Sequence, residues 1–172
     1  MTDHEWDENI FPLAYFITFR THGTWLHGDQ RKSVERHGRN LYNSPRIPPD
    51  PMFSELMNRN MTTEPVVLDS KMRGIVDLAI RNVCDHRNYL LSALHVRTNH
   101  AHVVSSAACH PKTVMNAFKA NATRELREAG LVGDGQKVWS RGGSTRYLWR
   151  QESVDRAIHY TLYGQGDDLP DF

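Results

Sequence analysis

The sequence has few cysteines, no long apolar run and almost no excess of either charge. Its two cysteines, Cys84 and Cys109, are too few and too far apart for a disulfide scaffold or a Cys-x-x-Cys motif, and they fit a reducing compartment. No apolar run approaches the length of about 18 residues that a transmembrane helix needs. Residues 2–8 are acidic and show no signal-peptide pattern. We therefore expect a cytoplasmic protein without a membrane segment.

The near-neutral total conceals an uneven distribution of charge. The 172 residues carry a formal net charge of only +1. Between residues 111 and 150, however, eight Lys and Arg residues stand against three Asp and Glu residues. Such a stretch is either a solvated helix surface or a surface that follows phosphate groups, and charge alone does not separate the two.

The pattern of apolar residues predicts seven elements in one domain spanning 1–172. Strands are expected at 13–19, 89–96, 101–106 and 145–149, and helices at about 70–85, 111–130 and 152–163. The first six elements match the ferredoxin-like, split βαβ order, an α+β fold with an antiparallel sheet and two helices on one face. Residues 20–67 are too long for an ordinary loop, so they form either a functional excursion or a small subdomain.

Two histidines flank one small residue in Asn99-His100-Ala101-His102-Val103-Val104. On a strand, side chains at i and i+2 point to the same face, so His100 and His102 lie side by side there. Ala101 then points the opposite way, toward the helices. Two imidazoles on one sheet face can bind one metal ion, although a pair of solvent-facing histidines without a ligand has the same pattern.

The last expected helix carries a tyrosine at an informative position. Its apolar stripe is formed by Val154, Ala157, Ile158, Thr161 and Leu162. Tyr160 lies off this stripe at its edge, whereas Tyr163 lies nearly opposite. Tyr160 is therefore either an aromatic residue at the rim of the core or a nucleophile. A phenol becomes useful against a phosphodiester when a cation withdraws charge from the phosphate.

The combination of a His-apolar-His strand with a following tyrosine helix resembles the single-tyrosine HUH transposases, including their REP-associated branch. The resemblance is carried by four segments, Arg97-Thr98-Asn99-His100-Ala101-His102-Val103-Val104, Val138-Trp139-Ser140-Arg141, Tyr147-Leu148-Trp149 and Ala157-Ile158-His159-Tyr160. It covers about 13–19 and 70–165, and it leaves 20–67 unexplained.

This resemblance implies a mechanism. His100 and His102 would coordinate Mg²⁺ or Mn²⁺ together with an oxygen ligand from the tyrosine helix, and the ion would polarise the scissile phosphate. Tyr160 would attack, which leaves a 5′-phosphotyrosine and a free 3′-OH. The substrates of the family are single-stranded DNA with imperfect hairpins. The active site would form within one chain or across a homodimer.

The chain departs from the family's pattern at the third metal ligand. The family usually places an amide four residues after the tyrosine, where this chain has Gly164, and the amide comes at Gln165. Either the helix ends early and Gln165 reaches the metal from a loop, or water fills the third position, or catalysis has been lost. His159 is a weaker ligand candidate, and Tyr163 is the second candidate nucleophile.

The basic middle of the chain is expected to contact the DNA backbone, since it would accompany a metal site. The six candidate DNA-binding residues are Lys112, Lys119, Arg124, Arg127, Arg141 and Arg146. Trp25, Trp139 and Trp149 are candidates to stack on bases, or they are residues of the core and its rim.

Two other functions remain open besides a DNA nickase and strand transferase. A module that binds nucleic acid without catalysis has the same type of sheet, and Gly164 favours it. A metal-dependent phosphoesterase without a covalent intermediate would use the histidines but not the tyrosine.

Overall fold

The structure is a computed structural model that describes residues 11–24, 33–34, 46–47, 51–52, 55, 59 and 64–166. Its elements are β1 (Ala14–Arg20), β2 (Ser33–Val34), β3 (Arg46–Ile47), α2 (Ser70–Arg87), β4 (Leu90–Val96), β5 (His100–Ser106), α3 (Pro111–Glu128), β6 (Ser144–Leu148) and α4 (Gln151–Tyr163). All seven elements expected from the sequence are present. No end of an element differs from its expected position by more than two residues.

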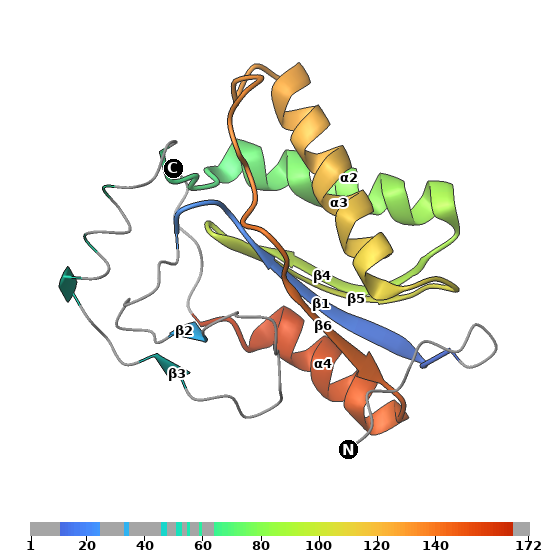
Figure 1. Ribbon diagram of the computed structural model, residues 1–172. Helices are drawn as coiled ribbons and strands as arrows, with labels where there is room; N and C mark the ends of the chain where they lie inside the picture. The colour runs from blue at the N-terminus through green and yellow to red at the C-terminus, as the bar shows by residue number, and fades with distance from the viewer. Residues whose placement is uncertain are drawn as a thin grey trace.

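Four strands form one antiparallel sheet in the order β4-β5-β1-β6. The first strand therefore lies between the third and the last strands of the sheet, as the split βαβ arrangement requires. Helices α2 and α3 cover one face, and α4 lies against the other (Figure 1). The predicted α+β, ferredoxin-like class is confirmed. Strands β2 and β3 pair separately, and most of the predicted excursion at 20–67 lies outside the described residues.

The face under α2 and α3 holds the main hydrophobic core. Alternate residues Tyr15, Ile17 and Phe19 of β1 point into it, as do Ala101 and Val103 of β5. This confirms the expected direction of Ala101. Helix α2 is bounded by a capping residue at each end. The Asp69 carboxylate accepts a hydrogen bond from the Met72 amide at 2.8 Å, and the helix ends at Asn88 in the left-handed conformation (φ 55°).

The opposite face carries a smaller apolar cluster beneath α4. It consists of Ala14, Ala93, Val104, Leu148, Val154 and Ala157, with Phe16 and Ile158 packed against it. Leu162 was expected in the apolar stripe of this helix, but it is 42% exposed because it lies beyond the edge of this cluster. The second sheet face is thus covered by α4 only in part, and polar residues occupy the remainder.

None of the described helices is both long enough and apolar enough to cross a membrane.

Candidate functional site

The polar part of the second sheet face is built by strand register. In β5, His102 lies between His95 of β4 and Thr18 of β1, and these three residues form one row across the sheet. One pair further along, His100 faces Arg20 of β1. Cross-strand partners point to the same side. The register therefore places two predicted metal ligands beside residues that are distant in sequence.

His102 is buried, with 7% of its surface exposed, and it is held by a neighbouring hydroxyl. Its Nδ1 lies 2.7 Å from Thr18 Oγ1. When the Nδ1–H donates to this hydroxyl, Nε2 keeps its lone pair for another ligand. Burial, reinforced by the nearby His100 and Arg20, lowers the pKa of His102 to about 3. The imidazole is therefore neutral at physiological pH, which is the form that binds a metal.

His100 lies between two side-chain oxygens. Its Nδ1 is 2.6 Å from Asn99 Oδ1 and its Nε2 is 3.2 Å from Gln165 Oε1. The Gln165 amide nitrogen donates to the Tyr160 carbonyl at 3.1 Å, which turns Oε1 toward the histidine. Burial lowers the pKa of His100, so the neutral ring has one N–H for two acceptors.

A cation between His100 and Gln165 would resolve this conflict. Neighbouring ligands of an octahedral ion with bonds of about 2.1 Å are roughly 3.0 Å apart, close to the observed 3.2 Å between Nε2 and Oε1. Amide oxygen suits both Mg²⁺ and Mn²⁺, and imidazole nitrogen suits Mn²⁺ better than the harder Mg²⁺. Among the described residues, no group of three or more His, Cys, Asp or Glu could hold a metal ion, and the side-chain oxygen beside His100 Nε2 is that of the Gln165 amide. The residues present fit the divalent ion that the sequence resemblance implies.

Gly164 explains why the amide stands at position 165. Helix α4 ends at Tyr163, and the Gly164 amide donates to the Tyr160 carbonyl at 2.9 Å. A Cβ atom at Gly164 would lie 2.6 Å from Cδ2 of the Tyr160 ring, well inside van der Waals contact. The absence of a side chain at 164 allows the tyrosine ring to fold over the helix end. Gln165 then reaches His100 from the following loop, which matches the first of the three alternatives for the third ligand.

Tyr160 lies next to the histidine pair. Its ring meets His102 edge-on at 5.6 Å between centroids and Phe16 at 6.0 Å, and Phe16 in turn stacks on His102 at 5.3 Å. The ring is 47% exposed, so it is open to a large substrate. Its predicted position at the edge of the apolar stripe is confirmed.

The second candidates on this helix lie elsewhere. Tyr163 is 74% exposed, and its ring pairs with the exposed His159 at 5.2 Å rather than with the histidines of the sheet. The structure thus brings together His100, His102, Tyr160 and Gln165.

Three residues of this arrangement were absent from the sequence prediction. Thr18 and Phe16 could have been recognised only as alternate residues of β1, because the expected fold places β1 beside β5 but does not give the register between the two strands. His95 was missed because the register between β4 and β5, which sets it opposite His102, is likewise not given by the sequence. Its Nδ1 lies 3.0 Å from the Thr161 carbonyl, so it joins the last turn of α4 to the sheet.

The six predicted DNA-binding residues are divided between the two sides of the sheet. Lys112, Lys119, Arg124 and Arg127 lie on α3, in the layer that faces away from the histidines. Lys119 donates to the carbonyls of Ser140 and Gly142, and Arg127 donates to those of Gly133 and Gln136. These two side chains hold the connection from α3 to β6.

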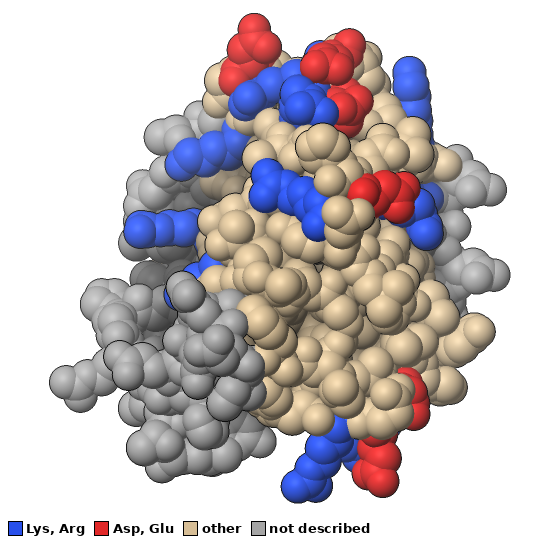
Figure 2. Space-filling view, turned by 90° about the vertical axis from the view of Figure 1, so that its right-hand side faces the viewer, with Lys and Arg blue, Asp and Glu red and all other residues tan. Residues whose placement is uncertain are grey.

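Arg124 pairs with acidic neighbours, at 2.9 Å from Glu125 and 3.8 Å from Glu128. In Figure 2, blue and red side chains alternate over the end of the molecule where the helical layer lies, and a broad uncharged surface separates them from a smaller charged group at the opposite end. Arg146, which is also exposed, differs from the α3 residues because it faces Phe16 across β6 and β1, on the side of the histidines. Arg141 precedes β6.

The three tryptophans differ in their surroundings. Trp139 is half-buried, meets Phe19 edge-on at 4.9 Å and donates to the Lys119 carbonyl, so it belongs to the edge of the core. Trp149 is 46% exposed, and Trp25 lies outside the described residues.

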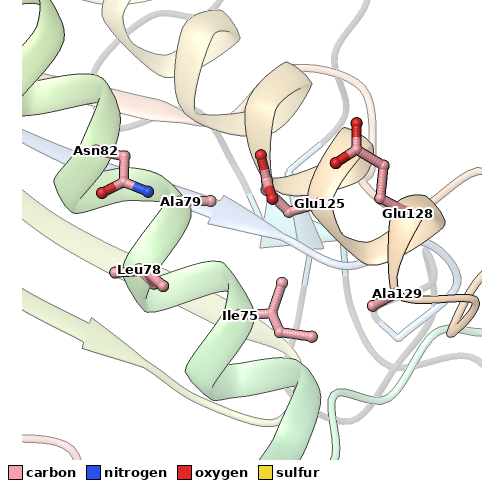
Figure 3. A pocket seen from close by; sticks show the side chains of 7 residues that line it. All are labelled: Ile75, Leu78, Ala79, Asn82, Glu125, Glu128 and Ala129. Atoms are coloured by element: carbon pink, nitrogen blue, oxygen red, sulfur yellow. The ribbon is translucent and has the colours of Figure 1, made fainter.

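A shallow hollow on the helical layer includes none of the four candidate site residues, His100, His102, Tyr160 and Gln165. It lies between α2 and α3 (Figure 3) and is lined by Ile75, Leu78, Ala79, Asn82, Glu125, Glu128 and Ala129. Its lining contains neither a nucleophile nor a set of metal ligands.

Comparison with known proteins finds similarity in fold alone. No protein-family model and no curated protein matches the sequence. The fold is similar to that of a REP-associated tyrosine transposase bound to a REP hairpin, with a TM-score of 0.54 and 11% identity over 95% of this chain and 72% of that one. It is also similar to a "putative transposase" from Deinococcus radiodurans R1, with a TM-score of 0.50 and 13% identity over 98% of this chain and 100% of that one.

Proposed function

We propose that this chain is a metal-dependent DNA nickase and strand transferase of the single-tyrosine HUH type, which acts on single-stranded or hairpin DNA. The observation that carries the proposal is the convergence of His100, His102, Tyr160 and Gln165 from β5 and the end of α4. The similarity in fold to a tyrosine transposase bound to a hairpin supports DNA as the substrate.

Tyr160 supplies the nucleophile. Its Oη attacks the scissile phosphorus, a P–Oη bond forms, and the P–O3′ bond breaks. The phenolic proton is lost and the 3′-oxygen takes up a proton, so the products are a 5′-phosphotyrosine and a free 3′-OH. A 3′-OH from another strand reverses these steps and restores a phosphodiester. The covalent link conserves the energy of the broken bond, so joining needs no ATP.

His100, His102 and Gln165 would hold Mg²⁺ or Mn²⁺. When bound, the divalent ion withdraws charge from the phosphate and orients it toward the nucleophile. Thr18 and Asn99 fix the orientation of the two imidazoles through their Nδ1 atoms. We expect Mn²⁺ to support activity at least as well as Mg²⁺, because imidazole is a poor ligand for the harder ion.

The proposal is tested by covalent capture. Labelled single-stranded DNA from the flanks of the gene is incubated with the protein and Mg²⁺ or Mn²⁺ and separated under denaturing conditions. We expect a protein–DNA adduct that Tyr160→Phe eliminates and Tyr163→Phe retains. Peptide mapping should place the nucleotide on Tyr160. An adduct on Tyr163 would contradict the assignment of the nucleophile.

Substitution of the histidines separates the remaining alternatives. His100→Ala and His102→Ala should each abolish nicking while hairpin binding persists, because phosphate contacts elsewhere dominate affinity. Mn²⁺ should raise the melting temperature of the parent protein and not that of either variant, since a ligand of the folded state stabilises it. Binding without any adduct would favour a non-catalytic module. Turnover that survives Tyr160→Phe would favour a phosphoesterase.

A further inference from the structure

Two exposed aromatic rings lie along β6, the outer strand of the sheet in the described part of the chain. Tyr147 is near the end of the edge strand β6 and Trp149 directly follows it, with 36% and 46% of their surfaces exposed. Their rings are close to parallel, at 14°, with centroids 6.1 Å apart. Leu148 between them points the other way, into the cluster under α4. The two rings therefore share one side of the strand.

The Tyr147 ring is held in place by a buried ring of the core. It meets the fully buried Tyr15 edge-on at 5.3 Å, and β1 and β6 pair at this position. An exposed aromatic ring that is fixed by the core loses little conformational freedom when a flat ligand stacks on it. The pair is thus a preorganised apolar surface rather than two mobile side chains.

The strand segment that carries the two rings has charge of one sign. The segment from Arg141 to Arg150 contains three arginines and no Asp or Glu. Arg146 and Arg150 are exposed. Aromatic rings beside cations, with no acidic residue in the segment, match a nucleic acid strand, whose bases stack and whose phosphates are negative. An apolar protein surface would need no such charge.

The pair lies on the α2–α3 side of the sheet, where Tyr147 faces Tyr15, whereas Arg146 between β6 and β1 points to the side of the candidate site. Arg146 faces Phe16 across the sheet, and Phe16 touches both His102 and Tyr160. The distance from β6 to β5 is two strand spacings, roughly 10 Å. A single strand that crosses the β6 edge can therefore pass from the aromatic pair to the tyrosine over Arg146.

We propose that Tyr147 and Trp149 form a stacking platform for unpaired bases of the single-stranded DNA next to the scissile phosphate, with Arg146 contacting its backbone. This inference rests on the proposed function. The platform makes the protein prefer a single-stranded flank over a fully paired stem, because only unpaired bases expose a ring face for stacking.

The test measures binding of a fluorescent oligothymidylate and of a blunt hairpin without unpaired flanks, by anisotropy. The full chain carries Tyr160→Phe so that no nicking occurs. We expect Tyr147→Ala and Trp149→Ala each to weaken oligothymidylate binding roughly 10-fold, within the range known for base stacking. Hairpin binding should change less than twofold, and Tyr147→Phe and Trp149→Phe should keep most of the affinity.

The matched control is Leu90→Ala, which removes a more exposed apolar side chain (68%) from the opposite edge strand, β4. It should leave both affinities unchanged. Thermal unfolding confirms that each variant is folded. The platform is overturned if the alanine variants bind oligothymidylate like the parent, or if they lose hairpin binding equally. Altered self-association with unchanged DNA binding would likewise overturn it in favour of a protein interface.

Failure of the platform is distinguishable from failure of the proposed function. If the native protein forms no adduct while Trp149→Ala still weakens oligothymidylate binding, the platform stands and the nickase does not. If the adduct forms and the binding is unaffected, only the platform is rejected.

Discussion

The two faces of the sheet are built from the same strands and serve different ends. On the face under α2 and α3, buried apolar side chains form one continuous core that includes Phe118, Ile80 and Leu126. On the face under α4, the row of Phe16 and Val104 belongs to an apolar cluster. The next rows along the same strands hold the polar residues Thr18, His102 and His100. The first face stabilises the fold, and the second holds polar groups in fixed positions.

The polar site is supported by strands that the core on the other face already holds in place. Strands β1 and β5, which position His102, also carry Ile17 and Val103 of the opposite core, and that core fixes them. Helix α4 adds few apolar contacts of its own, and its end is joined to the sheet by His95 and Gln165. The tyrosine is therefore carried by the least deeply packed helix of the described fold.

The largest expected effect is on stability and compares the two cores directly. Phe118→Ala removes a fully buried ring from the α2–α3 side and should lower the free energy of unfolding by about 3–5 kcal/mol. Val154→Ala under α4 should cost only about 1.5 kcal/mol, from two lost methyl groups. Urea unfolding measures both. The exposed Leu78→Ala is the control, expected within about 0.5 kcal/mol of the parent. Equal losses for Phe118→Ala and Val154→Ala would remove the distinction between the faces.

The next effect concerns the support of His102. Thr18→Val keeps the shape of the side chain but removes the hydroxyl at 2.7 Å from Nδ1. We expect Mn²⁺ affinity and nicking to fall roughly 10- to 100-fold, the range for the loss of a group that orients a metal ligand. Thr145→Val makes the same change on the opposite face, where Thr145 faces Ile17, and should have no such effect. Similar losses in both variants would point to a general effect on the sheet.

A smaller effect is expected at the helix end. Gly164→Ala places a Cβ atom 2.6 Å from the Tyr160 ring and 2.9 Å from the Tyr160 carbonyl oxygen, so both the ring and the end of α4 must shift. We expect adduct formation to slow by about 10-fold, a change typical of a misplaced reacting group, while Mn²⁺ binding persists. Gly74→Ala on α2, where nothing lies within 4 Å, is the control. It should leave the adduct unchanged and stabilise α2 slightly. Unchanged adduct kinetics in Gly164→Ala would show that the ring position is not needed.

The pH dependence of stability should also differ between the faces. Below its ordinary pKa of 6.5, an unfolded histidine takes up a proton, whereas burial holds the pKa of His102 at about 3 in the folded protein. The unfolded state then binds more protons, so stability falls as the pH drops from about 6.5 toward 3. Without divalent ions, His102→Asn should flatten this part of the curve. His86→Asn, at an exposed position of α2, should not. Parallel curves for the parent and His102→Asn would contradict the buried neutral imidazole.

The smallest expected effect separates the basic residues of the two sides. Arg146→Gln should reduce the slope of log affinity for single-stranded DNA against log salt by about one, the loss of one phosphate contact. Arg124→Gln should leave the slope unchanged, because Arg124 is paired with Glu125 on the helical layer. Filter binding at several salt concentrations measures both slopes. A larger change for Arg124→Gln would place the DNA on the helical layer, as the local excess of charge at 111–150 also allows.

The sequence by itself determined the elements and the direction of their side chains. Alternation in His100-Ala101-His102 placed two imidazoles on one face because the strand repeat is two residues, and the stripe of α4 placed Tyr160 at its edge because the helix repeat is 3.6. Both are local properties of the chain. The charge excess at 111–150 was equally visible, but it did not reveal that Lys119 and Arg127 are engaged with backbone carbonyls of the connection to β6.

Only the tertiary structure decided what stands beside these side chains. Strand pairing between β1 and β5 brought Thr18 to His102, across 84 residues of sequence, and the packing of α4 on the sheet brought Gln165 to His100, across 65. The same packing showed why Gly164 precedes the amide, since the tyrosine ring occupies the space of its missing side chain. A sequence pattern sets the direction of a residue on its own element. Register and packing between elements depend on contacts summed over the whole fold, so they set which residues meet.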